Sequence, residues 1–180
     1  MTRTSPFASW GADADERAAR YPCDELVADA DQTLFRAITV RAPAAVVFRW
    51  LCQLRLAPYS YDWIDNRGRR SPRRLVSGVE DLVTGQRFMT IFTLTDFEAD
   101  RQITVFTDHR LFGEVGITYL VTPREGAARL VVKLRVRFRR TPTGRVLRRV
   151  LPLGDLVMMR KQLRTLRRLA EVHARSGGAT

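Results

Sequence analysis

Residues 129–139 read Arg-Leu-Val-Val-Lys-Leu-Arg-Val-Arg-Phe-Arg, and this stretch decides the fold class. Apolar residues occupy every second position from Leu130 to Phe138, and cationic residues fill most positions between them. Because successive side chains of a strand point to opposite faces, this period of two predicts a β-strand with one apolar and one cationic face. Such a strand is typical of an antiparallel sheet that is covered on one side.

Strand signals also precede this stretch. A second run alternates in the same way, at Val115, Ile117, Tyr119 and Val121. Further strands are expected around Phe88, Phe92, Leu94, Ile103 and Val105, and an earlier one over residues 33–41. Glycine and proline residues between the runs favour turns. The sequence therefore predicts successive antiparallel strands between residues 86 and 140. The short connection at 89–91 suggests that its two flanking strands form one bent strand.

Two helices are expected outside the strand region, each with one apolar face. In residues 44–56 apolar side chains recur at Val47, Trp50, Leu51 and Leu54, the spacing of an amphipathic helix. A second stripe runs through residues 155–173, at Leu156, Met159, Leu163, Leu166, Ala170 and His173. We expect Asp155 to cap the N-terminus of this helix, because a carboxylate there accepts hydrogen bonds from unpaired backbone amides.

Together these elements predict an α+β helix-grip fold, in which a curved antiparallel sheet wraps around a long C-terminal helix. The apolar stripe of the helix can cover the apolar face of the sheet. Because a curved sheet and a straight helix leave space between them, we expect a cavity beneath the helix. We expect one domain over residues 21–174, a flexible N-terminal extension over 1–20, and a disordered tail over 175–180.

The charge is unevenly distributed along the chain. Residues 1–125 contain 16 basic and 17 acidic side chains, whereas residues 126–180 contain 15 basic and 2 acidic ones. The segment 12–31 contains seven acidic residues, which could fold back onto the basic third. We expect these acids and the cations of 129–139 to be solvated instead, because runs of charge usually face water.

Composition and motifs exclude several classes of protein. We expect a folded chain rather than a disordered one, since 45% of the residues are hydrophobic. The sequence has neither an apolar run of membrane-spanning length nor the charged-then-apolar order of a signal peptide, so we expect a cytoplasmic protein. Cys23 and Cys52 have no metal-ligand spacing, so we expect neither a zinc site nor any cofactor.

An aromatic motif follows Pro58. Residues 59–63 read Tyr-Ser-Tyr-Asp-Trp, which places three rings in five residues. With Arg36-Ala-Ile-Thr-Val-Arg-Ala-Pro43, this motif resembles a branch of the SRPBCC superfamily, the START-like and polyketide-cyclase-like helix-grip proteins. The resemblance covers residues 18–172. It implies a helix-grip fold around an apolar pocket, and ligands such as lipids, hormones or polyketides.

Candidate ligand-binding residues lie near this expected pocket. Aromatic rings suit a mostly apolar site, Asp62 could accept a hydrogen bond or act as a base, and Arg160 could meet an anionic group. The candidates are Trp50, Tyr59, Tyr61, Asp62, Trp63, Phe88, Phe92, Tyr119, Met159, Arg160 and Leu163. The alternatives are core packing for the apolar residues, helix capping or ion pairing for Asp62, and solvation for Arg160.

Three functions stay open at this point. The favoured one is binding of a small hydrophobic molecule in the cavity. A cyclase- or dehydratase-type enzyme using that cavity without a metal is the second, although no catalytic residue can be named, since His109 and His173 belong to no recognisable triad. The third is a basic surface for nucleic acid or an anionic membrane. Nucleic acid is disfavoured because aromatic residues are not interleaved with the arginines.

Overall fold

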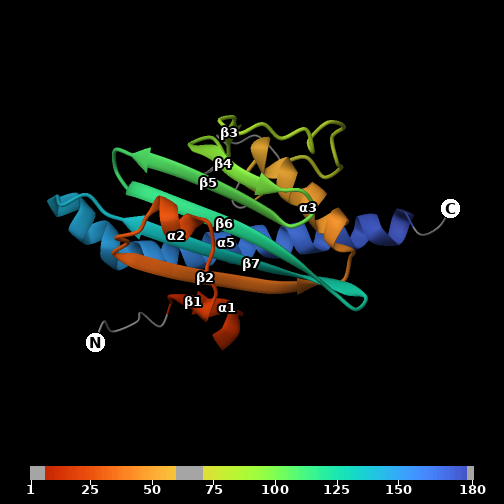
Figure 1. The fold of residues 1–180 in the computed structure, drawn as a ribbon, viewed down its shortest axis with the longest axis horizontal. Coiled ribbons are helices and arrows are strands. Elements are labelled where there is room, and N and C mark those ends of the chain that lie inside the picture. Colours follow the sequence, from red (N-terminus) through yellow and green to blue (C-terminus); the bar gives the residue numbers. More distant parts are fainter. Residues whose placement is uncertain (1–6, 60–70, 178–180) are drawn as a thin grey trace.

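The computed structural model describes residues 7–59 and 71–177 and places them in one mixed domain (Figure 1). Seven strands form one sheet in the order β1-β2-β7-β6-β5-β4-β3. The strands are β1 (Ser9–Trp10), β2 (Gln32–Val40), β3 (Arg87–Phe88), β4 (Phe92–Glu98), β5 (Gln102–His109), β6 (Gly113–Arg124) and β7 (Ala127–Arg137). The helices are α1 (Ala14–Ala18), α2 (Cys23–Leu26), α3 (Ala44–Cys52), the short 3-10 helix η1 (Gln53–Arg55) and α5 (Pro142–Gly177).

Layers of helix cover both faces of the sheet. Helix α5, blue in Figure 1, runs along one face together with α3, and the two helices contact each other. The short helix α2, red-orange, lies on the opposite face against β5, β6 and β7. A largely antiparallel sheet that packs against a long C-terminal helix confirms the predicted α+β helix-grip fold.

Strand β7 has the two faces that its sequence predicts. It lies between β2 and β6 and is antiparallel to both. Its alternating apolar side chains, from Leu130 to Val136, are buried in the core cluster that also contains the buried residues of α5. Because β7 lies between β2 and β6, its hydrogen bonds join β2, the first long strand of the chain, to the β6–β7 hairpin.

Helix α5 begins 13 residues before the expected start, at Pro142, and contains 36 residues. Pro142 suits a first helical turn, and Pro152 lies inside the helix. Pro152 has no N–H for the carbonyl of Arg148, and the Gln32 side chain donates to that carbonyl instead, at 2.6 Å. The prediction that Asp155 caps this helix is therefore wrong, because Asp155 lies three turns inside it.

The N-terminal segment is part of the fold from residue 7 onward, in contrast to the flexible extension expected over 1–20. Strand β1 adds in parallel to the edge of β2, with Ser9 opposite Phe35. Helix α1 follows with a capping box between Asp13 and Glu16. At the other end, α5 continues to Gly177, three residues into the segment expected to be a tail.

Strands β3 and β4 are separate strands rather than one bent strand. They pair as an antiparallel hairpin, and Met89 and Thr90 between them have φ of 43° and 71°. Two successive residues with positive φ are typical of a tight hairpin turn.

Among the described residues, no helix is both long and apolar enough to cross a membrane.

A left-handed glycine begins β6. Gly113 has a φ of 82°, and a Cβ at this position would overlap the carbonyl oxygen of Arg137. We expect Gly113→Ala to lower the free energy of unfolding by about 2 kcal/mol or more, because it adds this clash to a strained φ. Gly126→Ala is the control, since Gly126 has a φ of 63° with open space around an added Cβ, and should cost about 1 kcal/mol. Urea unfolding measures both, and equal losses would contradict the prediction.

Candidate functional site

The predicted pocket-lining residues that the structure describes lie mainly in the core. Trp50, Phe88, Tyr119 and Leu163 are each at most 2% exposed, and Met159 is buried beside them. Phe92 is half-buried and packs against the same cluster. Neither of the two pockets described below is lined by any of these six residues. A ligand-binding role for them therefore stays a prediction. Tyr61, Asp62 and Trp63 lie outside the described residues.

A hydrogen-bonded cluster lies between the sheet and α5. The Tyr119 hydroxyl donates to Gln162 Oε1 at 3.0 Å, and Gln162 Nε2 donates to the Pro58 carbonyl at 2.6 Å. Burial raises the pKa of Tyr119. The cluster therefore holds a neutral phenol and joins β6, α5 and the end of the α3 region. The sulfur of Met89 lies 3.6 Å from the same hydroxyl.

A buried ion pair lies further along the same face of α5. Arg36 Nη2 from β2 lies 2.7 Å from Asp155 Oδ2, and the Arg36 side chain is only 1% exposed. Arg36 also donates to the backbone carbonyls of Ala8, Phe35 and Pro152. Burial raises the pKa of Asp155 to about 6, while the nearby guanidinium opposes that rise. The pair joins β1, β2 and α5.

Sequence reasoning missed this pair, although two signals were present. Arg36 interrupts an otherwise apolar strand, and Asp155 is one of only two acids in the last 55 residues. Isolated charged residues within a strand and beside an apolar helical stripe are rarely buried unless they are paired, which would have been a reason to consider that the two charges meet. Their separation of 119 positions hid the contact from any local pattern.

Of the predicted site residues that the structure describes, Tyr59 alone lines a pocket, and Gln53 holds it in place. Tyr59 has a φ of 56° and is 2% exposed, and its ring meets that of Trp50 edge-to-face at a centroid distance of 6.2 Å. Its hydroxyl donates to the Pro72 carbonyl at 2.7 Å. Buried Gln53 contacts that hydroxyl and also donates to the Arg74 carbonyl at 2.9 Å. The segment after residue 71 is thereby tied to η1.

The pocket beside Tyr59, which we call the rim pocket, lies between this segment and the second half of α5. Its volume is about 460 Å³. Its lining residues are Tyr59, Ser71, Arg73, Lys161, Arg164, Thr165, Arg168 and Leu169. In the part of the chain that the structure describes, none of the four lining cations forms an ion pair with an acidic residue. The rim pocket is therefore suited to an anion.

The cations of the rim pocket were not among the predicted site residues. Lys161, Arg164 and Arg168 follow helical spacing, but arginine on the outer face of an amphipathic helix is commonplace and carries no local signal. Arg160 was predicted instead. It lies over the ring of Trp10, with its guanidinium carbon 5.2 Å from the ring centroid, and it does not line the rim pocket.

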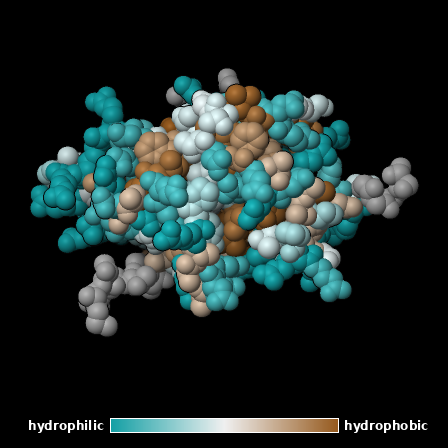
Figure 2. Space-filling model, viewed as in Figure 1, coloured by the Kyte–Doolittle hydropathy of each residue, from teal (hydrophilic) through white to brown (hydrophobic). Residues whose placement is uncertain are grey.

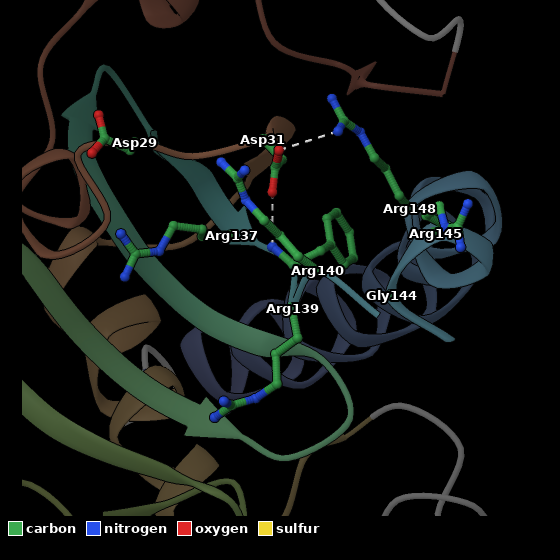
Figure 3. A pocket seen from close by; sticks show the side chains of 9 residues that line it. Asp29, Asp31, Arg137, Arg139, Arg140, Gly144, Arg145 and Arg148 are labelled. Atoms are coloured by element: carbon green, nitrogen blue, oxygen red, sulfur yellow. Dashed lines mark hydrogen bonds and ion pairs between the residues drawn. The ribbon is translucent and has the colours of Figure 1, made fainter. Parts of the chain in front are cut away.

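A second pocket, the arginine pocket, lies where β7 leads into α5. Its volume is about 730 Å³. It is lined by Asp29, Asp31, Arg137, Phe138, Arg139, Arg140, Gly144, Arg145 and Arg148, most of which are labelled in Figure 3. Asp31 accepts from the Phe138 amide at 2.9 Å and pairs with Arg148 at 3.2 Å. Arg137 and Arg139 pair with Glu114 and Asp108. Arg140 and Arg145 have no acidic partner among residues 7–59 and 71–177.

The cationic face of β7 is covered from Arg129 to Arg135 and exposed at Arg137, which corrects the expectation that this whole face is solvated. Glu16 pairs with Arg129 at 2.6 Å. Asp24 pairs with Lys133 at 2.7 Å and with Arg135 at 3.2 Å. The acidic N-terminal segment thus does fold back onto the basic third. The surface on this side shows separate apolar areas among hydrophilic residues (Figure 2).

Lys133 is enclosed by more than carboxylate oxygens. Its ammonium nitrogen lies 5.0 Å from the centroid of the Tyr21 ring and 5.3 Å from that of the Phe35 ring. Cys23 also packs here, and burial raises the pKa of its thiol. These contacts give α2 a small core of its own on the outer face of the sheet.

The fold is shared with solved structures of low sequence identity. The Zhui aromatase/cyclase from Streptomyces sp. R1128 is 15% identical, with 83% of this chain and 99% of that chain covered and a TM-score of 0.56. Protein NE0264 from Nitrosomonas europaea is 12% identical, with coverages of 78% and 95% and a TM-score of 0.51. Protein MLL2253 from Mesorhizobium loti is 14% identical, with coverages of 77% and 96% and a TM-score of 0.50. At these identities the likeness shows a common fold alone.

No protein-family model matches the sequence, and no curated protein matches it.

Proposed function

We propose that this protein binds a small molecule with an anionic group and an apolar body in the rim pocket. The observation that carries the proposal is that Arg73, Lys161, Arg164 and Arg168 line one hollow without acidic partners among the described residues. The guanidinium carbon of Arg164 also lies 5.9 Å from the centroid of the Trp10 ring. Four cations in one concave site attract and orient a carboxylate, sulfate or phosphate group, because hydrogen bonds from charged donors are the strongest ordinary ones.

The apolar part of the ligand would lie against Tyr59 and Leu169. Both side chains line the rim pocket and both are buried, so only their edges meet the hollow. Binding sites typically combine an apolar wall with polar groups that fix orientation. In the rim pocket the apolar part is small, Tyr59 and Leu169, and the other lining residues are polar or cationic. The sequence predicted a small apolar ligand beneath α5. We propose instead a ligand with an anionic group, bound beside the second half of α5.

The helix-grip fold supports a further part of the proposal, namely that the chain is a member of the SRPBCC superfamily. The sequence resemblance in residues 18–172 and the shared fold agree. The aromatase/cyclase among the structural neighbours raises the question of an enzyme. However, buried Arg36 is paired with Asp155, buried Tyr119 is hydrogen-bonded to Gln162, and none of the three lines either described pocket. The buried phenol of Tyr59 does line the rim pocket, but its hydroxyl already donates to the Pro72 carbonyl. Binding is therefore the function that the geometry supports better.

Laurate tests this proposal, with dodecanol as its uncharged counterpart of equal chain length. We expect laurate to bind more tightly than dodecanol, and the double substitution Lys161→Gln and Arg168→Gln to weaken laurate binding about tenfold or more, because two charge-assisted hydrogen bonds are lost. Arg167→Gln is the matched control, since Arg167 is exposed on the same helix but does not line the rim pocket. Isothermal titration calorimetry measures all three proteins.

Equal affinities for laurate and dodecanol, or equal weakening by the control, would contradict the proposal. Native mass spectrometry of the purified protein gives an independent readout, since a retained anionic amphiphile should dissociate on the double substitution but survive the control.

A further inference from the structure

The outer face of the first half of α5 exposes four large apolar side chains in a single row. Val146, Val150, Leu153 and Val157 are 61%, 54%, 49% and 47% exposed. Their spacings of four, three and four residues place them on one side of the helix. This side is opposite the buried face that contains Asp155 and Met159, at 100° of rotation per residue. We call these four residues the apolar stripe.

Nothing in the described part of the chain covers the apolar stripe. Exposed single apolar residues are normal, but four in one row over three turns form a continuous patch, and such patches usually mark a contact surface. The pattern is also confined to this half of the helix. Beyond Val157 the same side continues with Lys161, Arg164 and Arg168. The row of exposed apolar side chains on this side of α5 is therefore confined to the first half of the helix.

Arginines without an acidic partner in the described part of the chain border the apolar stripe. Arg145 and Arg149 lie four residues apart along one side of it, and both are exposed. Arg145 also lines the arginine pocket, where Arg140 is the other cation without an acidic partner among the described residues. In Figure 3 Arg148 projects from the first turns of α5 toward Asp31, Arg145 lies on the same turns of the helix, and Arg140 comes from the segment after β7. Residues 142–157 contain one acid, Asp155, which is paired with Arg36.

We propose that the first half of α5 docks on an anionic lipid bilayer. The apolar stripe enters the boundary between headgroups and acyl chains, and Arg140, Arg145 and Arg149 contact headgroup phosphates. An amphipathic helix with apolar residues on one side and arginines beside them lies in the plane of a membrane surface in this way. Clustered arginines add attraction to anionic lipids, and the arginine pocket offers room for a headgroup.

Charge argues against the two other occupants of this surface. In a symmetric pair of chains the same patch faces itself, so Arg145 and Arg149 of the two copies would face each other, and the one acid of residues 142–157, Asp155, is already paired with Arg36. A nucleic acid would satisfy the arginines but would leave the apolar stripe without a role. An anionic bilayer satisfies both, because it presents a negative surface above an apolar layer.

Vesicle co-sedimentation tests the proposal with the full chain. We expect binding to vesicles of phosphatidylcholine with 30% phosphatidylserine, and little binding to phosphatidylcholine alone. The double substitution Val150→Asp and Leu153→Asp should reduce binding more than tenfold. Val172→Asp is the matched control, since Val172 is 47% exposed on the same helix outside the apolar stripe, and should reduce binding much less. Substituting Arg145 and Arg149 with Gln should weaken binding about fivefold per arginine, and Arg175→Gln much less.

Three outcomes would overturn the proposal. The first is equal binding to neutral and anionic vesicles. The second is anionic binding that the Asp substitutions leave unchanged, with poly-glutamate competing equally for all variants, which would indicate a polyanion site without membrane insertion. The third is a concentration-dependent dimer in analytical ultracentrifugation that the Asp substitutions dissociate while vesicle binding persists. Circular dichroism shows that each variant is folded, and laurate binding should be unaffected, since none of these residues lines the rim pocket.

Discussion

Arg36→Met is expected to lower the free energy of unfolding by about 3–5 kcal/mol near neutral pH. The substitution keeps an unbranched side chain of similar length but removes the cation beside Asp155, whose side chain is 10% exposed. Removing one partner of a buried ion pair leaves an uncompensated charge, which costs far more than the pair contributes when intact. Three backbone carbonyls also lose their guanidinium donor.

A double-mutant cycle separates the lost pair from lost packing. Adding Asp155→Leu to Arg36→Met should restore most of the stability, because an apolar pair of similar volume often replaces a buried ion pair at little cost. Urea unfolding of the wild type, both single variants and the double variant gives the coupling energy. A double variant as unstable as the sum of both singles would mean that the two charges do not interact.

The effect should also depend on pH. Because the folded-state pKa of Asp155 is raised above its unfolded value, this group contributes stability that is complete below about pH 4 and is lost as pH rises through about 6. Without Arg36 that pKa should rise further, since its opposing cation is gone. The difference in stability between wild type and Arg36→Met should therefore be smaller at pH 5 than at pH 8.

Asp24→Leu is expected to lower the free energy of unfolding by about 2–4 kcal/mol. Asp24 pairs with both Lys133 and Arg135, and it accepts from the Tyr21 amide at 2.9 Å. Lys133 is 6% exposed, so it would be left as a buried cation without a carboxylate. The partial exposure of Asp24 itself places the expected loss below that for a fully buried pair.

Glu25→Leu is the control for this prediction. Glu25 is the next residue of α2, is exposed, and has no ion-pair partner in the described part of the chain. Its substitution should change stability by about 0.5 kcal/mol or less. Trypsin provides a second measurement: cleavage after Arg17 and Arg20 should accelerate in Asp24→Leu, because the segment packs less firmly on the sheet, and not in Glu25→Leu. Equal behaviour of the two variants would show that the pairs do not hold the segment.

Much of the fold could be predicted from the sequence because its signals are local. The alternation in β7 and the apolar positions Met159, Leu163 and Leu166 of α5 depend on strand and helix periods alone, and those side chains are buried as expected. The start of α5 could not be predicted in the same way. Pro152 normally ends a helix, and here Gln32, 120 positions earlier, compensates its missing hydrogen bond.

The candidate site was predictable in smaller part. Tyr59 could be chosen because aromatic rings near Pro58 suggest the wall of a pocket, and Tyr59 does line the rim pocket. Lys161, Arg164 and Arg168 could not be chosen, because only the position of the segment after residue 71 distinguishes them from other arginines of α5. The prediction that the acids of residues 12–31 and the cations of 129–139 are solvated was wrong for a related reason. The attraction between Asp24 and Lys133 depends on strand β7 bringing them together across 109 positions.

The placement of α2 on β7 also bears on the order in which the chain can fold as it leaves the ribosome. Strand β2 pairs with β7, Gln32 lying opposite Val136, so the first long strand has no partner on that side until the last strand has been synthesised. Helix α2 packs against β5, β6 and β7, so its contacts with β7 form equally late. Contacts between such distant residues slow folding, because a long loop must close before any of them form. We therefore expect the nascent chain to expose an unpaired apolar strand until about residue 137, and to need protection from aggregation during that interval.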